Sequence, residues 1–569
     1  MKKIELLAPA GSMANLKAAV SNGADAIYLG MNRFSARDYA TNFNETYLPE
    51  AIRITKSNNV KCYLAMNTLV KNSELRDYFD QISFAYSAGV DAVIIQQTSF
   101  IELIKKNFPD LRVHISTQAG VMNSLHANLL RKADRITLAR ELSLGEIQQI
   151  RNNFSGEIEI FCQGALCASV SGQCLFSSFL GGRSGNRGKC AQPCRKKYNG
   201  SFLLSTKELC LIRRIPDITR AGINAAKIEG RMRAPYYVAT ATKAYRKAID
   251  SFYDNNFSVS KETMQELESA FTREFTEGKF SGENIFNRST STGVTNPPAK
   301  TMYTVQVKDV AVGRKKILAA IPSFKATRSE QRLLCVKAYN EADAVSASKS
   351  GADVIYLDAF HADFAQIRSR VTAKVFAATP KILCDEDIQR LKQRLIDIEP
   401  DGILAGNSAM IGLDLGIPLH LDSNLNSFND IDVDSLLRKN ILPIISPELS
   451  IKEISEMKNK NFIVPVHGKI QLMTLLHDLP EGTIQDEKGG KFLIHKIFNG
   501  SEIINEREFC LLSKSTQLLQ SGINRFMIDT DRNVSQMVRF YRNILDGKPM
   551  QDSRLKDDYV LAWSYRGVI

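Results

Sequence analysis

The chain has 569 residues, 44% of them hydrophobic, and a formal net charge of +13. This length can bury more than one hydrophobic core, so we expect two or more domains. No apolar run approaches the about 20 residues of a membrane-spanning helix, and no apolar signal segment follows the first lysines. We therefore expect a cytoplasmic protein with no membrane partner. Its dispersed positive charge is compatible with anionic partners such as RNA.

Apolar strands and amphipathic helices alternate along the first half of the chain. Residues 5–12 predict a buried strand that ends in a turn, residues 15–21 a helix, and residues 23–30 a glycine turn into a second strand. The pattern continues as strand, helix, strand and strand over residues 61–67, 72–87, 89–95 and 113–117. Such alternation predicts parallel βα units. Their number favours an α/β fold with a TIM-like (β/α) barrel, and a doubly wound open sheet is the alternative.

Four cysteines are spaced C-x6-C-x15-C-x3-C in a glycine-rich, basic segment. They are Cys167, Cys174, Cys190 and Cys194. Ten cysteines in so long a chain do not indicate a secreted disulfide framework. Thiolates that converge from a flexible segment suit an iron–sulfur cluster or a tetrahedral metal ion. The spacing alone leaves three interpretations open: an iron–sulfur cluster, a structural zinc site, and thiols that bind nothing.

Three segments of the second half repeat segments of the first. Residues 351–357 (GADVIYL) repeat 23–29 (GADAIYL), residues 447–450 (PELS) repeat 140–143 (RELS), and residues 522–524 (GIN) repeat 222–224. Matches that keep their order over this length indicate a tandem duplication of a whole domain. We therefore predict two tandem TIM-like barrels joined by a linker and a small β element.

The predicted domain boundaries follow from this duplication. We expect a catalytic barrel over residues 1–285, a linker and small β element over 286–330, a second barrel over 331–550 and a C-terminal tail over 551–569. Residues 287–299 have the composition of a linker, and the alternation in residues 301–322 predicts a small β-hairpin that turns around Val312 and Gly313.

The two copies differ in their polar residues. The second copy lacks the cysteine segment, and the sequence KIEGR at residues 227–231 becomes MIDTD at residues 527–531. Because the second copy keeps the scaffold without these groups, we place the chemistry in the first repeat. The second repeat is then a structural or substrate-docking domain.

Barrel enzymes carry their chemistry at the C-terminal ends of their strands. This rule predicts two sets of residues in the first repeat. The predicted catalytic residues are Lys227, Glu229, Arg231 and Glu141, and the predicted substrate-binding residues are Asn67, His114, Gln118 and Arg140. Arginine and lysine suit a dicarboxylate or a phosphate, and glutamates can move protons.

Structural roles compete with these functional ones. His114 and Glu141 recur in the second copy as His420 and Glu448, which favours a structural role for both. The residues lost from the second copy favour function, with an ion pair inside the barrel as the alternative.

A longer signature surrounds the cysteines. From Glu159 to Ser177 the chain follows E-x-F-x-x-G-A-x-C-x-x-x-S-G-x-C-x-x-S. Together with LLAPAG at residues 6–11, NGADAIYL at 22–29, RELS at 140–143 and KIEGR at 227–231, this pattern resembles peptidase family U32, also called the collagenase-like proteases.

The resemblance implies an iron–sulfur enzyme. Members of the RNA-hydroxylating branch, which Cys190 and Cys194 match, bind a [4Fe–4S] cluster through cysteines of this region. They hydroxylate RNA bases without molecular oxygen and use prephenate as the oxygen donor, and a ubiquinone branch hydroxylates an aromatic ring. The implied cofactor is therefore a [4Fe–4S] cluster rather than zinc. The implied partners are RNA (rRNA or tRNA) and a small dicarboxylate donor.

Three functions follow from the sequence. The first is oxygen-independent hydroxylation of an RNA base. The second is proteolysis, as the family name says, although the chain contains no G-x-S-x-G, no H-E-x-x-H and no cysteine with an evident His/Asn set. The third is a non-catalytic iron–sulfur accessory protein.

Overall fold

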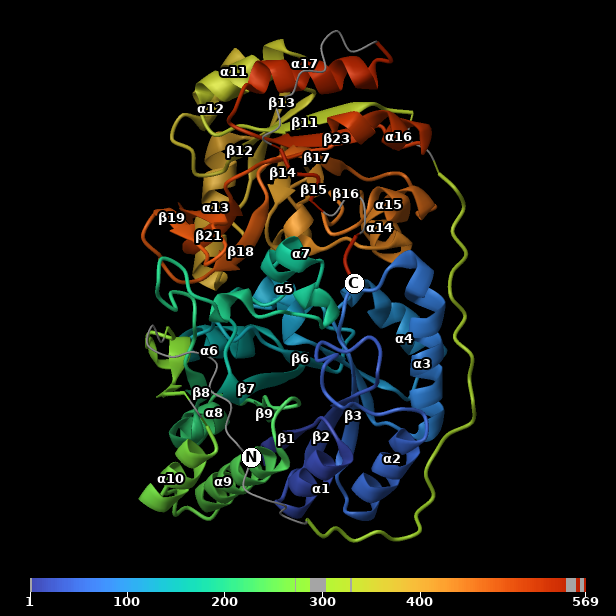
Figure 1. The fold of residues 1–569 in the computed structure, drawn as a ribbon, viewed down its shortest axis with the longest axis vertical. Helices are drawn as coiled ribbons and strands as arrows, with labels where there is room; N and C mark the ends of the chain where they lie inside the picture. The colour runs from blue at the N-terminus through green and yellow to red at the C-terminus, as the bar shows by residue number, and fades with distance from the viewer. Residues whose placement is uncertain (1–2, 272, 287–302, 328–329, 549–558, 563–566) are drawn as a thin grey trace.

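Two barrels are stacked on one another (Figure 1). The computed structural model describes residues 3–271, 273–286, 303–327, 330–548, 559–562 and 567–569. The N-terminal barrel lies at the bottom of the view and the C-terminal barrel at the top. No helix in these ranges is long and apolar enough to cross a membrane.

The first barrel is a closed parallel sheet. Within the described residues it has eight strands, because β7 and β1 both pair with β9. The strands are β1 (Glu5–Ala10), β2 (Ala26–Gly30), β3 (Lys61–Met66), β4 (Ala92–Ile95), β5 (Arg112–Ile115), β6 (Arg135–Thr137), β7 (Glu157–Ala165) and β9 (Ala225–Ile228). The closure confirms the predicted TIM-like barrel, and the doubly wound alternative is wrong.

Helices follow the strands of this barrel and cover it. They are α1 (Met13–Ser21), α2 (Tyr47–Ser57), α3 (Leu75–Ala88), α4 (Ile101–Asn107), α5 (Ser124–Leu129), α6 (Leu144–Asn153), α8 (Ile215–Arg220), α9 (Pro235–Tyr253) and α10 (Lys261–Ser269). Local sequence fixes their ends: the side chain of Ser12 accepts a hydrogen bond from the N–H of Asn15 at the start of α1. Gly89 ends α3 in a left-handed conformation (φ 101°).

The second barrel repeats this arrangement. Its strands are β11 (Leu333–Lys337), β12 (Val354–Asp358), β13 (Lys374–Ala378), β14 (Gly402–Ala405), β15 (Leu419–Leu421), β16 (Ile441–Pro443), β17 (Val464–Gly468) and β23 (Arg525–Asp529). They form a curled parallel sheet, and a parallel bridge between Ile444 and Ile463 joins the ends of β16 and β17. Its helices are α11 (Glu341–Lys349), α12 (Phe364–Arg370), α13 (Asp385–Ile398), α14 (Asp430–Leu437), α15 (Ile451–Glu456), α16 (Ser515–Gln520) and α17 (Val534–Leu545).

The segments between β7 and β8 and between β17 and β22 differ between the copies. In the first copy, the cysteine segment and the short helix α7 (Phe176–Gly181) separate β7 from the antiparallel strand β8 (Glu208–Cys210). In the second copy, a small antiparallel sheet separates β17 from β22 (Phe509–Cys510). Its strands are β18 (Gln471–Leu475), β19 (Gly482–Gln485), β20 (Lys491–Ile497) and β21 (Gly500–Asn505). The sequence had not predicted this sheet.

The two barrels face each other through the C-terminal ends of their strands. After β3, Asn72 Nδ2 donates to Asp430 Oδ2, which follows β15, at 2.9 Å. After β5, Asn123 Nδ2 donates at 2.9 Å to the carbonyl of Leu383, which follows β13. Because both sides of these contacts follow strand ends, the mouths of the two barrels meet. The cysteine segment lies between them.

The segment between the barrels is an extended strap. Residues 303–327 run along the outside of the first barrel without strand pairing until Thr327 bridges Asn459 (Figure 1). The N–H of Ala320 donates at 2.7 Å to Asn107 Oδ1 at the end of α4, and Ser57 donates at 2.9 Å to the carbonyl of Lys308.

Two predictions concern this strap and the chain end. The small β-hairpin expected in residues 301–322 is wrong for the described residues, because their backbone groups bond to helix ends of the first barrel rather than to each other. The linker predicted at 287–299 lies outside the described residues. The described ends of the predicted tail are packed: Val560 pairs with Phe509, and the N–H of Ile569 donates to the carbonyl of Gly182 at 2.9 Å.

A buried ion cluster fills the first barrel. Arg135 Nη1 donates to Glu5 Oε1 at 2.6 Å and lies 3.4 Å from Glu159 Oε2, and Tyr63 donates to Glu5 at 2.9 Å. Burial raises the pKa of Glu5, but the charge and hydrogen bond of Arg135 and those of Lys61 outweigh it and hold the pKa at about 2. Glu5 is therefore a carboxylate at neutral pH.

We expect Glu5→Gln to destabilise the protein in a pH-dependent way. The folded-state pKa lies below the unfolded one, so the stabilisation is present above about pH 4.5 and lost as the pH falls towards 2. This pKa shift corresponds to about 3 kcal/mol at pH 7. Urea unfolding of the wild type and the variant at pH 7 and pH 3 measures it. Glu102→Gln is the control, because Glu102 is exposed in its pair with Lys132. An equal loss at both pH values would contradict the prediction.

Candidate functional site

Six of the predicted residues line one small pocket. The pocket has a cavity volume of about 30 Å³ and lies in the mouth of the first barrel. The six are Asn67, Gln118, Arg140, Lys227, Glu229 and Arg231. Each follows a strand or, for Lys227, lies within one, so closure of the barrel brings them together. Parts of the chain more than 150 residues apart meet here, as expected at the C-terminal face of such a barrel.

Glu229 is held by groups that the sequence analysis missed. Arg37 Nε donates to Glu229 Oε1 at 3.1 Å, and Tyr28 donates to Glu229 Oε2 at 3.4 Å. Burial raises the pKa of Glu229, but Arg37, Arg140 and Arg231 outweigh it and hold the pKa at about 2. At neutral pH Glu229 is therefore a fixed carboxylate that positions cations and hydroxyl groups.

Lys227 takes part in an ion pair and also faces the pocket. Its Nζ lies 2.8 Å from Glu159 Oε1 and 4.5 Å from the centre of the Tyr28 ring. Burial lowers the pKa of Lys227, and the attraction of Glu159 opposes that change. The internal ion pair that competed with a functional role is thus present, and Lys227 still lines the cavity.

Arg231 and Arg140 are fixed by contacts at the pocket edge. Arg231 is 4% exposed and donates to the hydroxyl of Ser35. Burial lowers its pKa to about 10, which leaves it charged at neutral pH. Arg140 Nη1 donates to the carbonyl of Ala165 at 2.7 Å, and its guanidinium lies 4.4 Å from the centre of the Phe161 ring.

The four predicted thiols lie near one another and beside this pocket. Cys167 interacts electrostatically with Cys174, Cys190 and Cys194. Burial and neighbouring thiols raise the pKa of Cys174 and bring the pKa of Cys194 to about 12. Arg140 lies close enough to Cys167, and Arg37 to Cys190, to interact with these thiols. The thiols and the pocket therefore form one site.

The cysteine segment is held by hydrogen bonds from both barrels. Within it, the N–H of Ala191 donates to Ser177 Oγ at 2.7 Å, and the N–H of Gln192 donates to Cys190 Sγ at 3.3 Å. Towards the second barrel, the N–H of Val170 donates to the carbonyl of Thr474 at 2.8 Å. The segment also packs on the loop of Arg37, where Gly188 lies directly against Ser35.

These thiols are chemically suited to an iron–sulfur cluster. Cysteine sulfur is the donor that holds such clusters, and an N–H directed at sulfur tunes them. Among the described residues, no three or more His, Cys, Asp or Glu side chains lie close enough to hold a single metal ion.

His114 and Glu141 do not line the pocket. His114 is completely buried in the barrel, where its ring packs edge to face with Tyr63 at 4.7 Å between centres. Burial holds its pKa well below the usual value, so it is neutral. Burial raises the pKa of Glu141 to about 7, and Arg140 opposes that shift. Glu141 lies near Cys167 rather than in the cavity.

The missed residues had a weak signal in the sequence. Tyr28 lies in the predicted second strand, and Arg37 lies in the loop between β2 and α2, which spans residues 31–46. A loop of that length at the C-terminal end of a barrel strand is itself a functional signal. Neither residue type nor spacing indicated that Arg37 would turn back towards Glu229.

The sequence profile of peptidase family U32 matches residues 11–289, which include the first barrel from α1 onward and the cysteine segment. An uncharacterized protease of Methanocaldococcus jannaschii is 40% identical over 300 residues, which cover 49% of this chain and 73% of that protein. The chain belongs to peptidase family U32. This result confirms the resemblance noted in the sequence.

Two further U32 relatives are named for RNA hydroxylation. The tRNA hydroxylation protein P of Helicobacter pylori is 36% identical over 303 residues, covering 49% of this chain and 72% of that protein. The 23S rRNA 5-hydroxycytidine synthase of Escherichia coli is 33% identical over 282 residues, covering 47% of this chain and 43% of that protein. The matches span about half of this chain.

We expect Gly188→Ala to displace the cysteine segment. Gly188 has φ +84°, and an added Cβ would lie 2.2 Å from the carbonyl oxygen of Ser35. Hydrogen exchange of residues 183–190 should increase strongly, with a fall in melting temperature. Gly181→Ala is the matched control, because nothing lies within 4 Å of its Cβ position. Unchanged exchange in Gly188→Ala would show that this contact does not hold the segment.

Proposed function

We propose that this U32 protein hydroxylates an RNA base of rRNA or tRNA without molecular oxygen. The observation that carries the proposal is the joint site in the first barrel, where four thiols lie beside a pocket rich in cations. The names of the U32 relatives that act on tRNA and rRNA support RNA as the substrate. The positive charge of the chain is compatible with it.

The charges of the pocket suit an anionic co-substrate. Four cationic side chains, Arg37, Arg140, Lys227 and Arg231, line it. Glu229 offsets one of these charges and Glu159, the partner of Lys227, offsets another, which leaves a surplus of two positive charges. Cations that are buried and fixed by hydrogen bonds bind carboxylates well. We therefore propose a small dicarboxylate, prephenate in the family pattern, as the oxygen donor. Replacing C–H by C–OH oxidises the base by two electrons, so the donor loses its oxygen and is reduced by two electrons.

Cys167, Cys174, Cys190 and Cys194 would hold a [4Fe–4S] cluster, which supplies electron transfer when it is bound. The residues of the chain supply the rest. Arg140 and Arg231 orient the donor carboxylates, and Glu229 keeps Arg37 and Tyr28 in place. Lys227, desolvated and next to Glu159, presents N–H groups to the reacting oxygen.

A peptidase is the second candidate, because the relative from Methanocaldococcus jannaschii is named a protease. The first-barrel pocket offers it little support. No serine or cysteine that lines the pocket forms a described hydrogen bond to a histidine there, and the nearby His114 is enclosed and neutral. Nucleophilic proteolysis needs such a pair.

A substitution taken from the second barrel tests the proposed chemistry. Lys227→Met introduces the residue at the equivalent position, Met527, and should reduce hydroxylation by about 100-fold or more, because it removes a preorganised charge. The readout is mass spectrometry of rRNA and tRNA from a deletion strain complemented with each variant. Loss of one nucleoside with one extra oxygen is expected. Lys243→Met, on the exposed side of α9, is the control.

The same deletion strain separates the candidate functions. Unchanged RNA together with lost cleavage of gelatin would support the peptidase and refute hydroxylation. Unchanged RNA with unchanged cleavage would support an accessory protein.

The cofactor has its own test. Anaerobically purified protein should be brown, with broad absorbance at about 400 nm and iron and sulfide in a 1:1 ratio. Cys174→Ser should lose most of the colour and iron. Cys384→Ser should keep them, because Cys384 lies in the second barrel, outside the four-thiol site. A colourless wild type with about one zinc per chain would overturn the cluster.

A further inference from the structure

The second barrel has a cavity of its own, and it is the larger one. The cavity volume is about 100 Å³, against about 30 Å³ in the first barrel. It lies in the mouth of the second barrel: Lys337 ends β11, Asp422 follows β15 and Asp529 ends β23. Size alone does not locate the chemistry, since the four thiols lie beside the smaller pocket. The larger cavity therefore needs a separate explanation.

The two cavities occupy equivalent positions. Phe161 pairs with Lys227 in the first barrel and Pro465 pairs with Met527 in the second, and each pairing is followed by the same register shift. The equivalent lining residues are Ser116 and Asp422, Gln118 and Asn424, Arg140 and Pro447, Phe161 and Pro465, Lys227 and Met527, and Glu229 and Asp529. The duplication has thus kept the cavity while changing its chemistry.

One wall of the second cavity has become apolar. The cations Arg140 and Lys227 are replaced by Pro447 and Met527. Aliphatic and aromatic side chains continue this wall: Ile445, Leu449, Ile451, Val464, Phe509 and Leu511. An apolar surface of this kind, kept open in a cavity, suits the apolar body of a small molecule.

The lysines at the cavity are already paired. Lys337 Nζ lies 3.5 Å from Asp529, Lys469 Nζ lies 2.7 Å from Asp531, and Lys381 Nζ lies 2.7 Å from Glu502. Their charges are therefore neutralised by neighbouring carboxylates. This barrel mouth lacks the cation surplus of the first.

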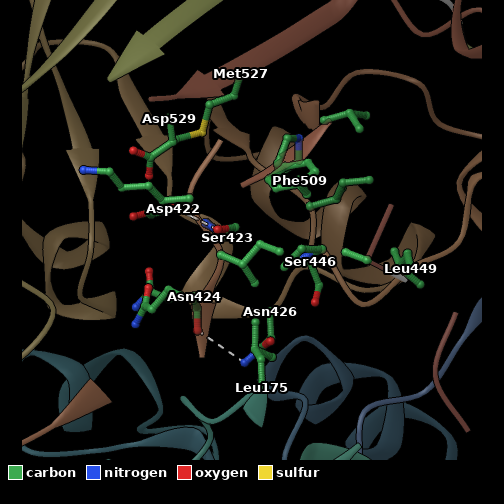
Figure 2. Close-up of a pocket in the computed structure, with 18 of the residues that line it drawn as sticks. Leu175, Asp422, Ser423, Asn424, Asn426, Ser446, Leu449, Phe509, Met527 and Asp529 are labelled. Carbon is green, nitrogen blue, oxygen red and sulfur yellow. Dashed lines mark hydrogen bonds between the residues drawn. The ribbon is translucent and has the colours of Figure 1, made fainter. Parts of the chain in front are cut away.

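The polar side of the second-barrel cavity carries hydrogen-bond acceptors. Asn424 Oδ1 is buried without a hydrogen-bond partner, whereas its Nδ2 donates to the carbonyl of Gly406 at 2.9 Å. Asp422 adds a half-buried carboxylate whose Oδ1 accepts from the N–H of Ser423 at 2.6 Å. Figure 2 shows Asp422, Ser423 and Asn424 on one side of the cavity and Phe509 and Leu449 on the other.

We propose that the second barrel binds a small amine: a molecule with an apolar, ring-sized body and a protonated amino group. The amino group donates to Asp422 and Asn424, and the apolar body packs on Val464, Phe509 and Met527. Burial strengthens an ammonium–carboxylate contact when the remaining N–H groups also find acceptors. This inference does not depend on the function proposed for the first barrel.

The ligand would also touch the cysteine segment. Gln173 and Leu175, the neighbours of Cys174, line the same cavity. Asn426, labelled below the centre of Figure 2, donates from Nδ2 to the carbonyl of Gly172 at 3.0 Å. An amine in the second barrel therefore contacts the segment that carries one of the four thiols.

Isothermal titration calorimetry of the full chain with three probes of one shape tests the proposal. The probes are benzylamine, benzyl alcohol and benzoate. Benzylamine should bind at one saturable site, at least about tenfold more tightly than benzoate, because the free groups are acceptors. Equal or tighter binding of benzoate, or no saturable binding of any probe, would overturn the proposal.

Variants locate the site and separate binding from misfolding. Asp422→Asn should weaken benzylamine at least about tenfold and leave benzyl alcohol nearly unchanged. Asp414→Asn is the control, because Asp414 is exposed and lies in the preceding loop, between β14 and β15. If Asp422→Asn lowers the melting temperature, its weaker binding could reflect misfolding, and a second variant is needed. Met527→Lys places a cation on the apolar wall and should reverse the probe preference, so that benzoate binds more tightly than benzylamine. Unchanged probe preference in a folded Met527→Lys variant would refute the site.

Discussion

Main-chain hydrogen bonds tie the cysteine segment of the first barrel to the added sheet of the second. The N–H of Leu175 donates to the carbonyl of Leu472 at 2.7 Å, and Cys174 forms a β-bridge with Met473. Side-chain bonds do not fix a glycine-rich loop this firmly, because they leave its backbone groups free to move. The position of Cys174 relative to the first-barrel pocket therefore depends on how the two barrels are docked. This gives the second barrel a role in positioning the cysteine segment even though it lacks the four cysteines.

The mouth-to-mouth arrangement gives the polar loops of each barrel hydrogen-bond partners in the other barrel. Each barrel has irregular loops at the C-terminal ends of its strands, and these loops contain polar groups that need partners. Here they satisfy one another: Asp432, after β15, accepts from Gln97, after β4, at 2.7 Å, and Asn429 donates to the carbonyl of Val70 at 2.9 Å. The interface thus buries polar groups in pairs.

The sequence predicted the barrels well because their signals are local or repeated. Buried strands, capped helices and duplicated motifs such as GADAIYL can be recognised from the sequence alone. The hairpin in residues 301–322 failed for the opposite reason. Its alternation resembles a strand pair, yet Ala320 bonds to Asn107 on a distant helix. Backbone groups that form hydrogen bonds to a distant helix do not need a neighbouring strand. The local sequence pattern contains no information about such distant partners.

In the candidate site, too, the residues at strand ends were predicted, and the residue placed by the folding of a long loop was missed. Lys227, Glu229 and Arg140 were found because strand ends of a barrel converge by geometry. Arg37 was missed because its contribution depends on how a long loop folds back over Tyr28 and Glu229. His114 was predicted to bind substrate from its position near a strand end, but its side chain is buried inside the barrel, packs on Tyr63 and does not line the pocket. Side-chain direction within a short strand depends on its register, which alternates with every residue.

The mouth of the first barrel is cationic and that of the second is partly apolar. This difference depends on whether a buried cation has a carboxylate partner. In the first barrel, Lys227 is held by Glu159, which also accepts from Thr137 at 2.8 Å, so a desolvated cation persists next to a cavity. In the second barrel, Met527 needs no such support. Once the lysine is gone, no buried cation has to be stabilised, and an apolar wall can widen the space. Replacement of Arg140 and Lys227 by Pro447 and Met527 therefore removes two cations from the second mouth and leaves an apolar wall opposite Asp422 and Asn424.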